Sequence, residues 1–156
     1  MSARTLTSYL DENRISYTTI THSPAFTAQE VAQSAHVPGR ELAKTVMVKL
    51  DGKIVEAVLP ASHFVDLESL KFATGAESAE LATEEEFDGC FPDCEVGAQP
   101  PCGNLYGMEV YVSPSLKRER QIIFNAGSHS ELICMLYKDF EHLVHPTELP
   151  LSRSAA

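Results

Sequence analysis

The stretch Thr45-Val46-Met47-Val48-Lys49-Leu50-Asp51-Gly52-Lys53-Ile54-Val55-Glu56-Ala57-Val58-Leu59 decides the fold class. Two runs of β-branched and apolar residues flank Asp51-Gly52, a dipeptide that readily adopts the positive φ angles of a tight two-residue turn. The stretch therefore predicts an antiparallel hairpin, and a hairpin excludes a sheet built only of parallel strands.

Helices are expected on both sides of this hairpin. Thr27-Ala28-Gln29-Glu30 and Thr83-Glu84-Glu85-Glu86 have the capping-box spacing, in which a Thr and a Glu three residues apart satisfy free N–H groups at a helix start. Pro38-Gly39 ends the first of these helices. Periodicity predicts helices over residues 4–13, 28–36, 66–74, 116–120 and 137–144, a short one from 84, and further strands over 14–21, 110–112, 121–126 and 132–136.

This order of elements predicts an α/β (α+β) fold with a mixed, largely antiparallel sheet flanked by helices. The segments do not alternate as regular βαβ units, which argues against a doubly wound sheet. No repeat, low-complexity tract or Gly/Ser linker divides the 156 residues. We therefore expect a single domain over residues 2–148, followed by a C-terminal tail over residues 149–156.

The charge balance is strongly acidic. Twelve Lys and Arg residues stand against 22 Asp and Glu residues, a formal net charge of −10, and residues 77–95 hold eight acids and no Lys or Arg. Such a surface repels phosphate backbones, which argues against a broad nucleic-acid face and against DNA as a partner. The acidic stretch is predicted to be a solvated face.

The sequence has no apolar run of the roughly 18 residues that a membrane helix needs. Its first ten residues lack the features of a signal peptide. We therefore predict a cytoplasmic protein with no membrane partner.

Familiar metal, nucleotide and serine motifs are missing from the sequence. Of four cysteines only Cys90 and Cys94 are closely spaced, without the second pair of a zinc ribbon, and His142-x2-His145 is no ligand motif. No Gly-x-Ser-x-Gly, Walker or Gly-x-Gly-x-x-Gly pattern occurs. We predict four unrelated thiols, no metal and no cofactor, while a cysteine nucleophile stays open.

Three segments could carry chemistry. Lys44 starts an apolar strand, where its ammonium can meet a phosphate or be a solvated strand-end lysine. Residues 97–107, rich in Gly and Pro, form a loop whose backbone could polarise a carbonyl or be purely structural. His129 follows a strand in a Gly-containing turn, where it could act on a substrate or be a surface residue.

These segments belong to four blocks whose order carries a resemblance. The blocks are His22-Ser23-Pro24-Ala25-Phe26-Thr27, Ala43-Lys44-Thr45-Val46-Met47-Val48, Gly97-Ala98-Gln99-Pro100-Pro101-Cys102-Gly103-Asn104 and Asn125-Ala126-Gly127-Ser128-His129. In this order, over about residues 6–144, the chain resembles the YbaK/prolyl-tRNA synthetase associated domain family. Its members are aminoacyl-tRNA deacylases that act within a synthetase or as free-standing proteins.

The resemblance implies a compact mixed sheet, nearly closed into a barrel, with a pocket for the aminoacyl end of tRNA. Lys44 matches the family lysine that holds the terminal adenosine and its phosphate. Gly97 and Pro101 match a Gly-x3-Pro loop whose backbone holds the aminoacyl group, and His129 matches a pocket position used in some members. Lys44, Gly97, Pro101 and His129 are thus the expected catalytic set, and the expected substrate-binding residues are Phe26, Thr27, Thr45, Ala98, Gly127 and Ser128.

The function implied is trans-editing, the hydrolysis of a mischarged tRNA that carries a small amino acid. A placed water and the substrate's own ribose hydroxyl would suffice, because the ester is already activated. The expected partner is the acceptor end of aminoacyl-tRNA only, with a synthetase as a second candidate. Alanine-specific members often have Asn after the lysine, where this chain has Thr45, so no amino acid is assigned.

Two alternatives remain from the sequence. One is a non-catalytic module that binds a tRNA acceptor end or a synthetase. The other is a hydrolase of another small aminoacyl ester, for which tRNA is irrelevant.

Overall fold

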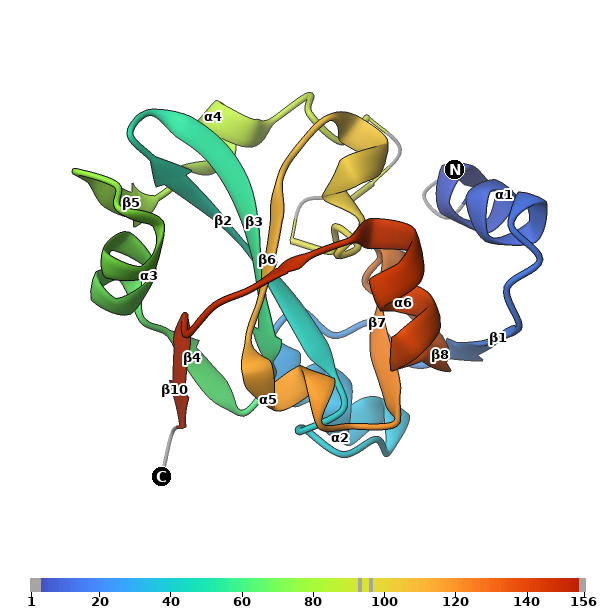
Figure 1. Ribbon diagram of the computed structural model, residues 1–156. Helices are drawn as coiled ribbons and strands as arrows, with labels where there is room; N and C mark the ends of the chain where they lie inside the picture. Colours follow the sequence, from blue (N-terminus) through green and yellow to red (C-terminus); the bar gives the residue numbers. More distant parts are fainter. Residues whose placement is uncertain (1–3, 93, 96, 155–156) are drawn as a thin grey trace.

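A computed structural model describes residues 4–92, 94–95 and 97–154 of the chain (Figure 1). Helices and short strands alternate irregularly along it. The elements are α1 (Arg4–Glu12), β1 (Tyr17–Thr21), α2 (Ala28–Ala35), β2 (Ala43–Leu50), β3 (Lys53–Pro60), β4 (His63–Val65), α3 (Leu67–Thr74), β5 (Ala79–Leu81), α4 (Glu84–Phe87), the 3₁₀ helix η1 (Gly103–Tyr106), β6 (Val110–Val112), α5 (Pro114–Lys117), β7 (Gln121–Ser128), β8 (Glu131–Leu136), α6 (Tyr137–Val144), β9 (Thr147–Glu148) and β10 (Ser152–Ser154).

The strands form three hydrogen-bonded sheets, in the orders β5-β2-β3-β6-β9, β1-β8-β7 and β10-β4. Pairing is parallel between β3 and β6 and between β6 and β9, and antiparallel elsewhere in these sheets. The mixed, largely antiparallel α/β class is therefore confirmed. The ladders of the described residues do not close into a barrel, because the two larger sheets meet through a single bridge between Leu42 and Ile123.

The hairpin that decides the fold class is confirmed. Its strands β2 and β3 pair antiparallel from Ala43 opposite Pro60 to Leu50 opposite Lys53. Asp51 and Gly52 have φ angles of 51° and 83°, as a tight two-residue turn requires. Lys44 consequently lies at the end of the hairpin that is far from the turn.

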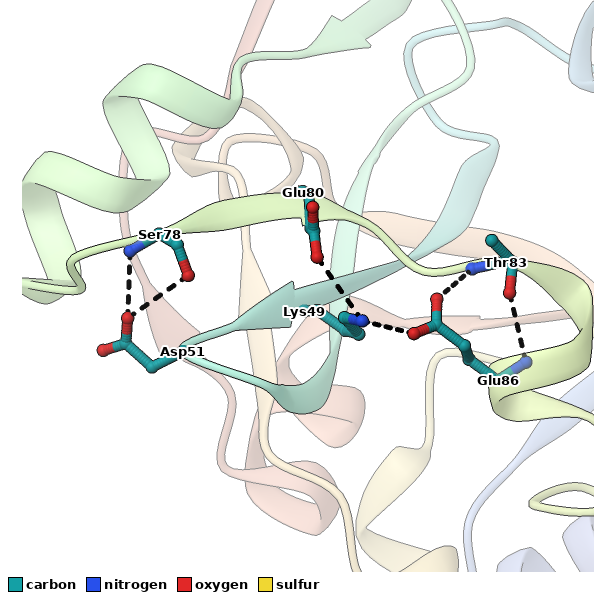
Figure 2. A network of polar contacts seen from close by, with 6 residues as sticks. All are labelled: Lys49, Asp51, Ser78, Glu80, Thr83 and Glu86. Atoms are coloured by element: carbon teal, nitrogen blue, oxygen red, sulfur yellow. Dashed lines mark hydrogen bonds and ion pairs between the residues drawn. The ribbon is translucent and has the colours of Figure 1, made fainter.

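The turn end of the hairpin is tied to the acidic segment (Figure 2). The Lys49 ammonium contacts Glu80 at 3.4 Å and also Glu86, and the Asp51 carboxylate accepts the Ser78 N–H at 2.9 Å. Glu86 also closes the capping box with Thr83. Part of the segment predicted to be a solvated face therefore holds α4 and β5 against the hairpin.

Several boundaries differ from the sequence predictions. The basic helix expected over 116–120 is α5, which begins earlier because Pro114 suits the first helical position. Strand β7 runs on to Ser128 with an irregular register between Asn125 and Ser128, where Gly127 has a φ angle of 97°. In the segment predicted as a tail, Leu151 is fully buried and β10 pairs with β4.

Three clusters of buried side chains form the core. The largest joins α1 and α6 to β7 and β8, and a second lies between α3 and the β2–β3 hairpin. The third packs α2 over the junction of the two larger sheets, with Val31 against Leu42 and Ile123. The start of α2, fixed by the confirmed Thr27–Glu30 capping box, is thereby held beside the start of β2.

In the described part of the chain, no helix is long and apolar enough to span a membrane.

Candidate functional site

Lys44 lies in a hollow of about 180 Å³ between the start of α2 and strand β4. Thr27, His63 and Phe64 are among the residues that line it. The Lys44 Nζ atom lies over the Phe64 ring, 5.7 Å from its centroid. Burial lowers the pKa of the Lys44 ammonium, and burial together with the Lys44 charge lowers the pKa of His63. The hollow therefore presents a cation that has lost part of its hydration, which suits an anionic ligand.

Gly97, His129 and Phe26 form a second group, and Phe26 lines a separate hollow of about 280 Å³. Gly97 has a φ angle of +87°, and a Cβ atom placed on it would lie 3.3 Å from Cε1 of His129. The imidazole and the Phe26 ring pack with their centroids 4.6 Å apart. The absence of a side chain at Gly97 thus brings loop backbone directly against the imidazole.

Backbone hydrogen bonds fasten the loop to the end of β7. The Gly127 N–H donates to the Ala98 carbonyl at 3.1 Å, and the Glu95 N–H donates to the Gly127 carbonyl at 2.8 Å. The Glu95 carboxylate accepts a hydrogen bond from the backbone N–H of His129 at 2.7 Å. Glu95 therefore fixes the turn that carries His129, and sequence reasoning missed it because it stood in a run of solvated acids.

Gln99 was also missed by the sequence analysis. It is only 7% exposed, and its Oε1 accepts the Gly97 N–H at 3.1 Å. Sequence reasoning expected exposed backbone groups on this loop, yet this particular N–H already has a partner. A substrate oxygen could use it only if the Gln99 amide moved aside.

The predicted residues fall into two neighbouring groups. Lys44 and Thr27 share the hollow, Gly97 and His129 lie against Phe26, and consecutive residues Phe26 and Thr27 join the groups. The Thr27 hydroxyl itself accepts the Glu30 N–H as the helix cap.

The remaining predicted residues have supporting positions. Ala98 and Pro101 are buried within the loop, and the Ser128 hydroxyl donates to Glu131 at 3.2 Å. Thr45 follows Lys44 on a strand, so its side chain points to the opposite face of the sheet. Thr45 is therefore not brought together with Lys44.

Two of the four thiols are poor candidates for a nucleophile, and the described residues do not assemble a metal site. Burial raises the pKa of the Cys102 and Cys134 thiols, which disfavours the reactive thiolate. Across residues 4–92, 94–95 and 97–154, no three His, Cys, Asp or Glu side chains come close enough together to hold a metal ion.

A family profile described as the aminoacyl-tRNA editing domain matches residues 22–143, which contain every predicted site residue. The chain belongs to the aminoacyl-tRNA editing domain family. A proline–tRNA ligase of Nitratidesulfovibrio vulgaris (strain Hildenborough) is 30% identical to this editing domain over 133 residues, 85% of the chain. The chain spans only about a fifth (21%) of that ligase.

Solved structures share the fold of this editing domain. One, described as a proposed trans-editing enzyme for prolyl-tRNA synthetase, superposes with a TM-score of 0.81 over 97% of each chain at 18% identity. Another, the hypothetical protein APE2540, gives a TM-score of 0.84 over 95% of this chain and 99% of its own, at 19% identity. At these identities the likeness establishes the architecture.

Proposed function

We propose that this editing domain is a trans-acting deacylase that hydrolyses the ester bond of a mischarged tRNA carrying a small amino acid. The proposal is supported by the convergence of the Gly97 backbone, the His129 imidazole and the Phe26 ring, and by Thr27, the next residue after Phe26, which lines the Lys44 hollow. The fold neighbour described as a proposed trans-editing enzyme supports action in trans, since it covers nearly the whole of this chain.

In this proposal Lys44 binds the terminal phosphate of the tRNA. Its ammonium is partly desolvated, so its attraction to a phosphate is less screened than that of an exposed lysine. The hollow is small, and this favours contact with the last nucleotide over contact with the acceptor stem. The charge thus positions the ester rather than activating it.

The loop that contains Gly97, together with His129, positions the attacking water and the ester. The water oxygen attacks the ester carbonyl, the bond to the ribose oxygen breaks, and the proton released by the water returns to that leaving oxygen. His129 can accept a hydrogen bond from the water, and the ribose hydroxyl of the substrate can relay the proton. Phe26 packs against the imidazole and limits the room left for the amino-acid side chain.

One observation favours the non-catalytic alternative. The Gly97 N–H is occupied by Gln99, so it does not stabilise an oxyanion in this arrangement. A binding module would retain this closed loop, whereas a deacylase would exchange the Gln99 contact for one with substrate. Hydrolysis measurements separate the two alternatives directly.

The test is single-turnover hydrolysis of a panel of mischarged tRNAs by the wild type and by Lys44→Ala. Lys53→Ala is the matched control, because it removes the same charge from the turn end of the hairpin, where Lys53 pairs with Glu109 at 3.2 Å. We expect loss of activity for Lys44→Ala and wild-type rates for Lys53→Ala.

Equal effects of the two substitutions, or no wild-type activity on any tRNA, would overturn the proposal. A minimal aminoacyl-adenosine ester tests the remaining alternative. Hydrolysis of that ester at the rate seen with tRNA would identify a general aminoacyl esterase.

A further inference from the structure

A further hollow, of about 390 Å³, lies between the end of α5 and the start of α6 (Figure 1). It shares no lining residue with the Lys44 hollow or with the hollow lined by Phe26. Strand β7 begins beside it and ends at the turn that carries His129, so the two places lie at opposite ends of the β7–β8 pair. Its volume is within the range of about 300–1,000 Å³ that is usual for small-molecule sites.

Two cations of this hollow have no acidic partner. The lining includes three cations and two carboxylates. Glu119 pairs with an arginine outside the hollow at 3.5 Å, and Glu141 pairs with Lys117 at 3.4 Å. Within the described part of the chain, Arg120 and Lys138 form no ion pair. On a chain of net charge −10, two unpaired cations at one hollow favour an anionic ligand.

The start of α6 adds backbone donors to these cations. Its N-cap residue Leu136 makes no side-chain hydrogen bond to the free N–H groups of the first turn. The Tyr137 N–H donates to the Arg120 carbonyl at 2.9 Å. The next two N–H groups, those of Lys138 and Asp139, have no carbonyl partner within the helix. They remain as donors at the positive end of the helix dipole.

The Tyr137 side chain is an independent indication of a ligand. It lines the hollow and is only 4% exposed, and its hydroxyl has no hydrogen-bond partner among the described residues. Burial, together with the charges of Glu141 and Glu148, raises the pKa of this hydroxyl, which therefore remains a donor at neutral pH. Glu141 lines the same hollow. Because a buried hydroxyl without a partner is unfavourable, an acceptor atom of a ligand would stabilise it.

We propose that this hollow binds a small phosphate monoester, with its phosphate group at Arg120, Lys138 and the start of α6. The organic part of the ligand packs against Leu136 and the Tyr137 ring, and the Tyr137 hydroxyl donates to one of its oxygens. A phosphate at a helix N-terminus beside an arginine and a lysine accepts several charge-assisted hydrogen bonds. The site is separate from the proposed deacylase site and does not depend on it.

The charges around the hollow favour a small ligand over a nucleic-acid backbone. Asp139 lies in the first turn of α6, and Glu148 lies 4.0 Å from the Lys117 ammonium. Together with Glu119 and Glu141, these carboxylates repel a polyanion that would run across the hollow. A compact phosphate ester that enters the hollow carries its charge directly to the two unpaired cations.

The test uses phenyl phosphate as the probe. It is titrated into ¹⁵N-labelled wild-type protein and followed in ¹H–¹⁵N spectra. We expect saturable shifts of the backbone N–H signals of Lys138 and Asp139, which distinguish this hollow from phosphate bound at Lys44. Inorganic phosphate should bind at least about threefold more weakly at the same signals, because it has no organic part to bury.

Variants assign the contacts. Arg120→Gln and Lys138→Gln should each weaken phenyl phosphate binding at least about fivefold, because each removes a charge-assisted contact. Tyr137→Phe should weaken it about threefold, the effect of one neutral hydrogen bond. Arg118→Gln is the matched control, because Arg118 is exposed and close in sequence to Arg120 but does not line the hollow. Its affinity should stay within about twofold of the wild type.

Several results would overturn the proposal. One is the absence of saturable wild-type shifts at Lys138 and Asp139, and another is equal affinity of the wild type, Arg120→Gln and Tyr137→Phe. A loss in Arg118→Gln as large as in Arg120→Gln would mean that general surface charge attracts the probe. Shifts caused by an acceptor-stem minihelix but not by phenyl phosphate would assign the hollow to RNA instead. None of these results bears on the hydrolysis test of the deacylase.

Discussion

Gly97 is constrained twice, by its backbone angle and by its neighbour. Its φ angle of +87° disfavours any residue with a Cβ atom. A Cβ atom on Gly97 would also lie only 3.3 Å from Cε1 of the His129 ring. Gly89 has the same φ angle, with nothing within 4 Å of its Cβ position. The pair of glycines therefore separates backbone strain from contact with His129.

We expect Gly97→Ala to lower deacylation at least about tenfold, because it displaces the imidazole from the loop backbone. Both Gly97→Ala and Gly89→Ala should cost about 1–2 kcal/mol of stability from the left-handed conformation. Urea unfolding and single-turnover rates measure the two effects. A loss of activity shared by both variants would mean that strain, and not the His129 contact, is responsible.

The lowered pKa of Lys44 predicts that deacylase activity falls at alkaline pH. Burial lowers the pKa of its ammonium, so the charge proposed to bind phosphate is lost at a lower pH than for an exposed lysine. Above that pKa, kcat/KM should fall about tenfold per pH unit. Lys44→Arg keeps its charge to higher pH and should extend the plateau.

The measurement for Lys44 is kcat/KM against pH, corrected for spontaneous ester hydrolysis. Coincident profiles for wild type and Lys44→Arg would show that another group sets the alkaline limit.

At the scale of single residues, the sequence predicts candidate residues for the chemistry but not the side chains that support them. Lys44, Gly97 and His129 stand in motifs whose residue types announce a cation, a strained turn and an imidazole. The Glu95 side chain bonds to the backbone of His129, which only the fold brings near, and the Gln99 side chain turns back onto the Gly97 backbone two residues earlier. No local pattern marks either partner, because the Glu95 contact forms only on folding and the Gln99 contact depends on the conformation of the loop.

At the scale of elements, strand β3 supports the loop of residues 97–107 through the side chain of Glu56. This carboxyl is fully buried, its Oε1 accepts the Gly103 N–H at 2.8 Å, and its Oε2 has no partner. Burial raises its pKa well above the ordinary value, outweighing the Gly103 hydrogen bond. The Glu56 side chain therefore favours a neutral, protonated form.

Glu56 predicts a pH dependence of stability. A folded-state pKa above the unfolded value means that the folded protein holds the proton more tightly. The stabilisation is complete below the unfolded pKa of about 4.5 and is lost as pH rises through the raised folded value. Glu56→Gln keeps the acceptor for Gly103 and removes this titration.

We expect the free energy of unfolding of Glu56→Gln, minus that of the wild type, to increase as pH rises from about 4.5 to about 8. Urea titrations at several pH values measure it. A constant difference across that range would show that Glu56 has the same pKa in the folded and unfolded protein.

The confirmed elements include those with strong local signals. Asp51-Gly52 fixes a turn and the two Thr–Glu pairs fix helix starts whatever lies around them. Strands β4, β5, β9 and β10 have two or three residues each. Such strands exist only because a partner strand supplies hydrogen bonds, and a sequence window of that length holds no period.

At the scale of the whole molecule, the net charge of −10 limits how tRNA can be held. Under the proposed function we expect a cation of the site such as Lys44 to contact only the last phosphates of the tRNA, because the acidic remainder of the surface repels the stem. The class of fold followed from the order of elements, whereas the open arrangement of the sheets depends on contacts that no order of elements specifies.

This charge distribution predicts weak tRNA affinity with a shallow salt dependence. A plot of log affinity against log salt should have a slope of about −1 to −2, because single-stranded phosphates contribute roughly −0.7 each. Fluorescence anisotropy of a labelled acceptor-stem minihelix at several salt concentrations measures it. A slope steeper than about −4 would indicate many stem phosphates in contact.

The most direct test of the proposed deacylase is the single-turnover rate constant for release of amino acid from mischarged tRNAs at saturating protein. We expect at least one mischarged tRNA, carrying a small amino acid, to be hydrolysed about 100-fold or more faster than in buffer, with its correctly charged counterpart spared. Rates equal to spontaneous hydrolysis across the whole panel would contradict it.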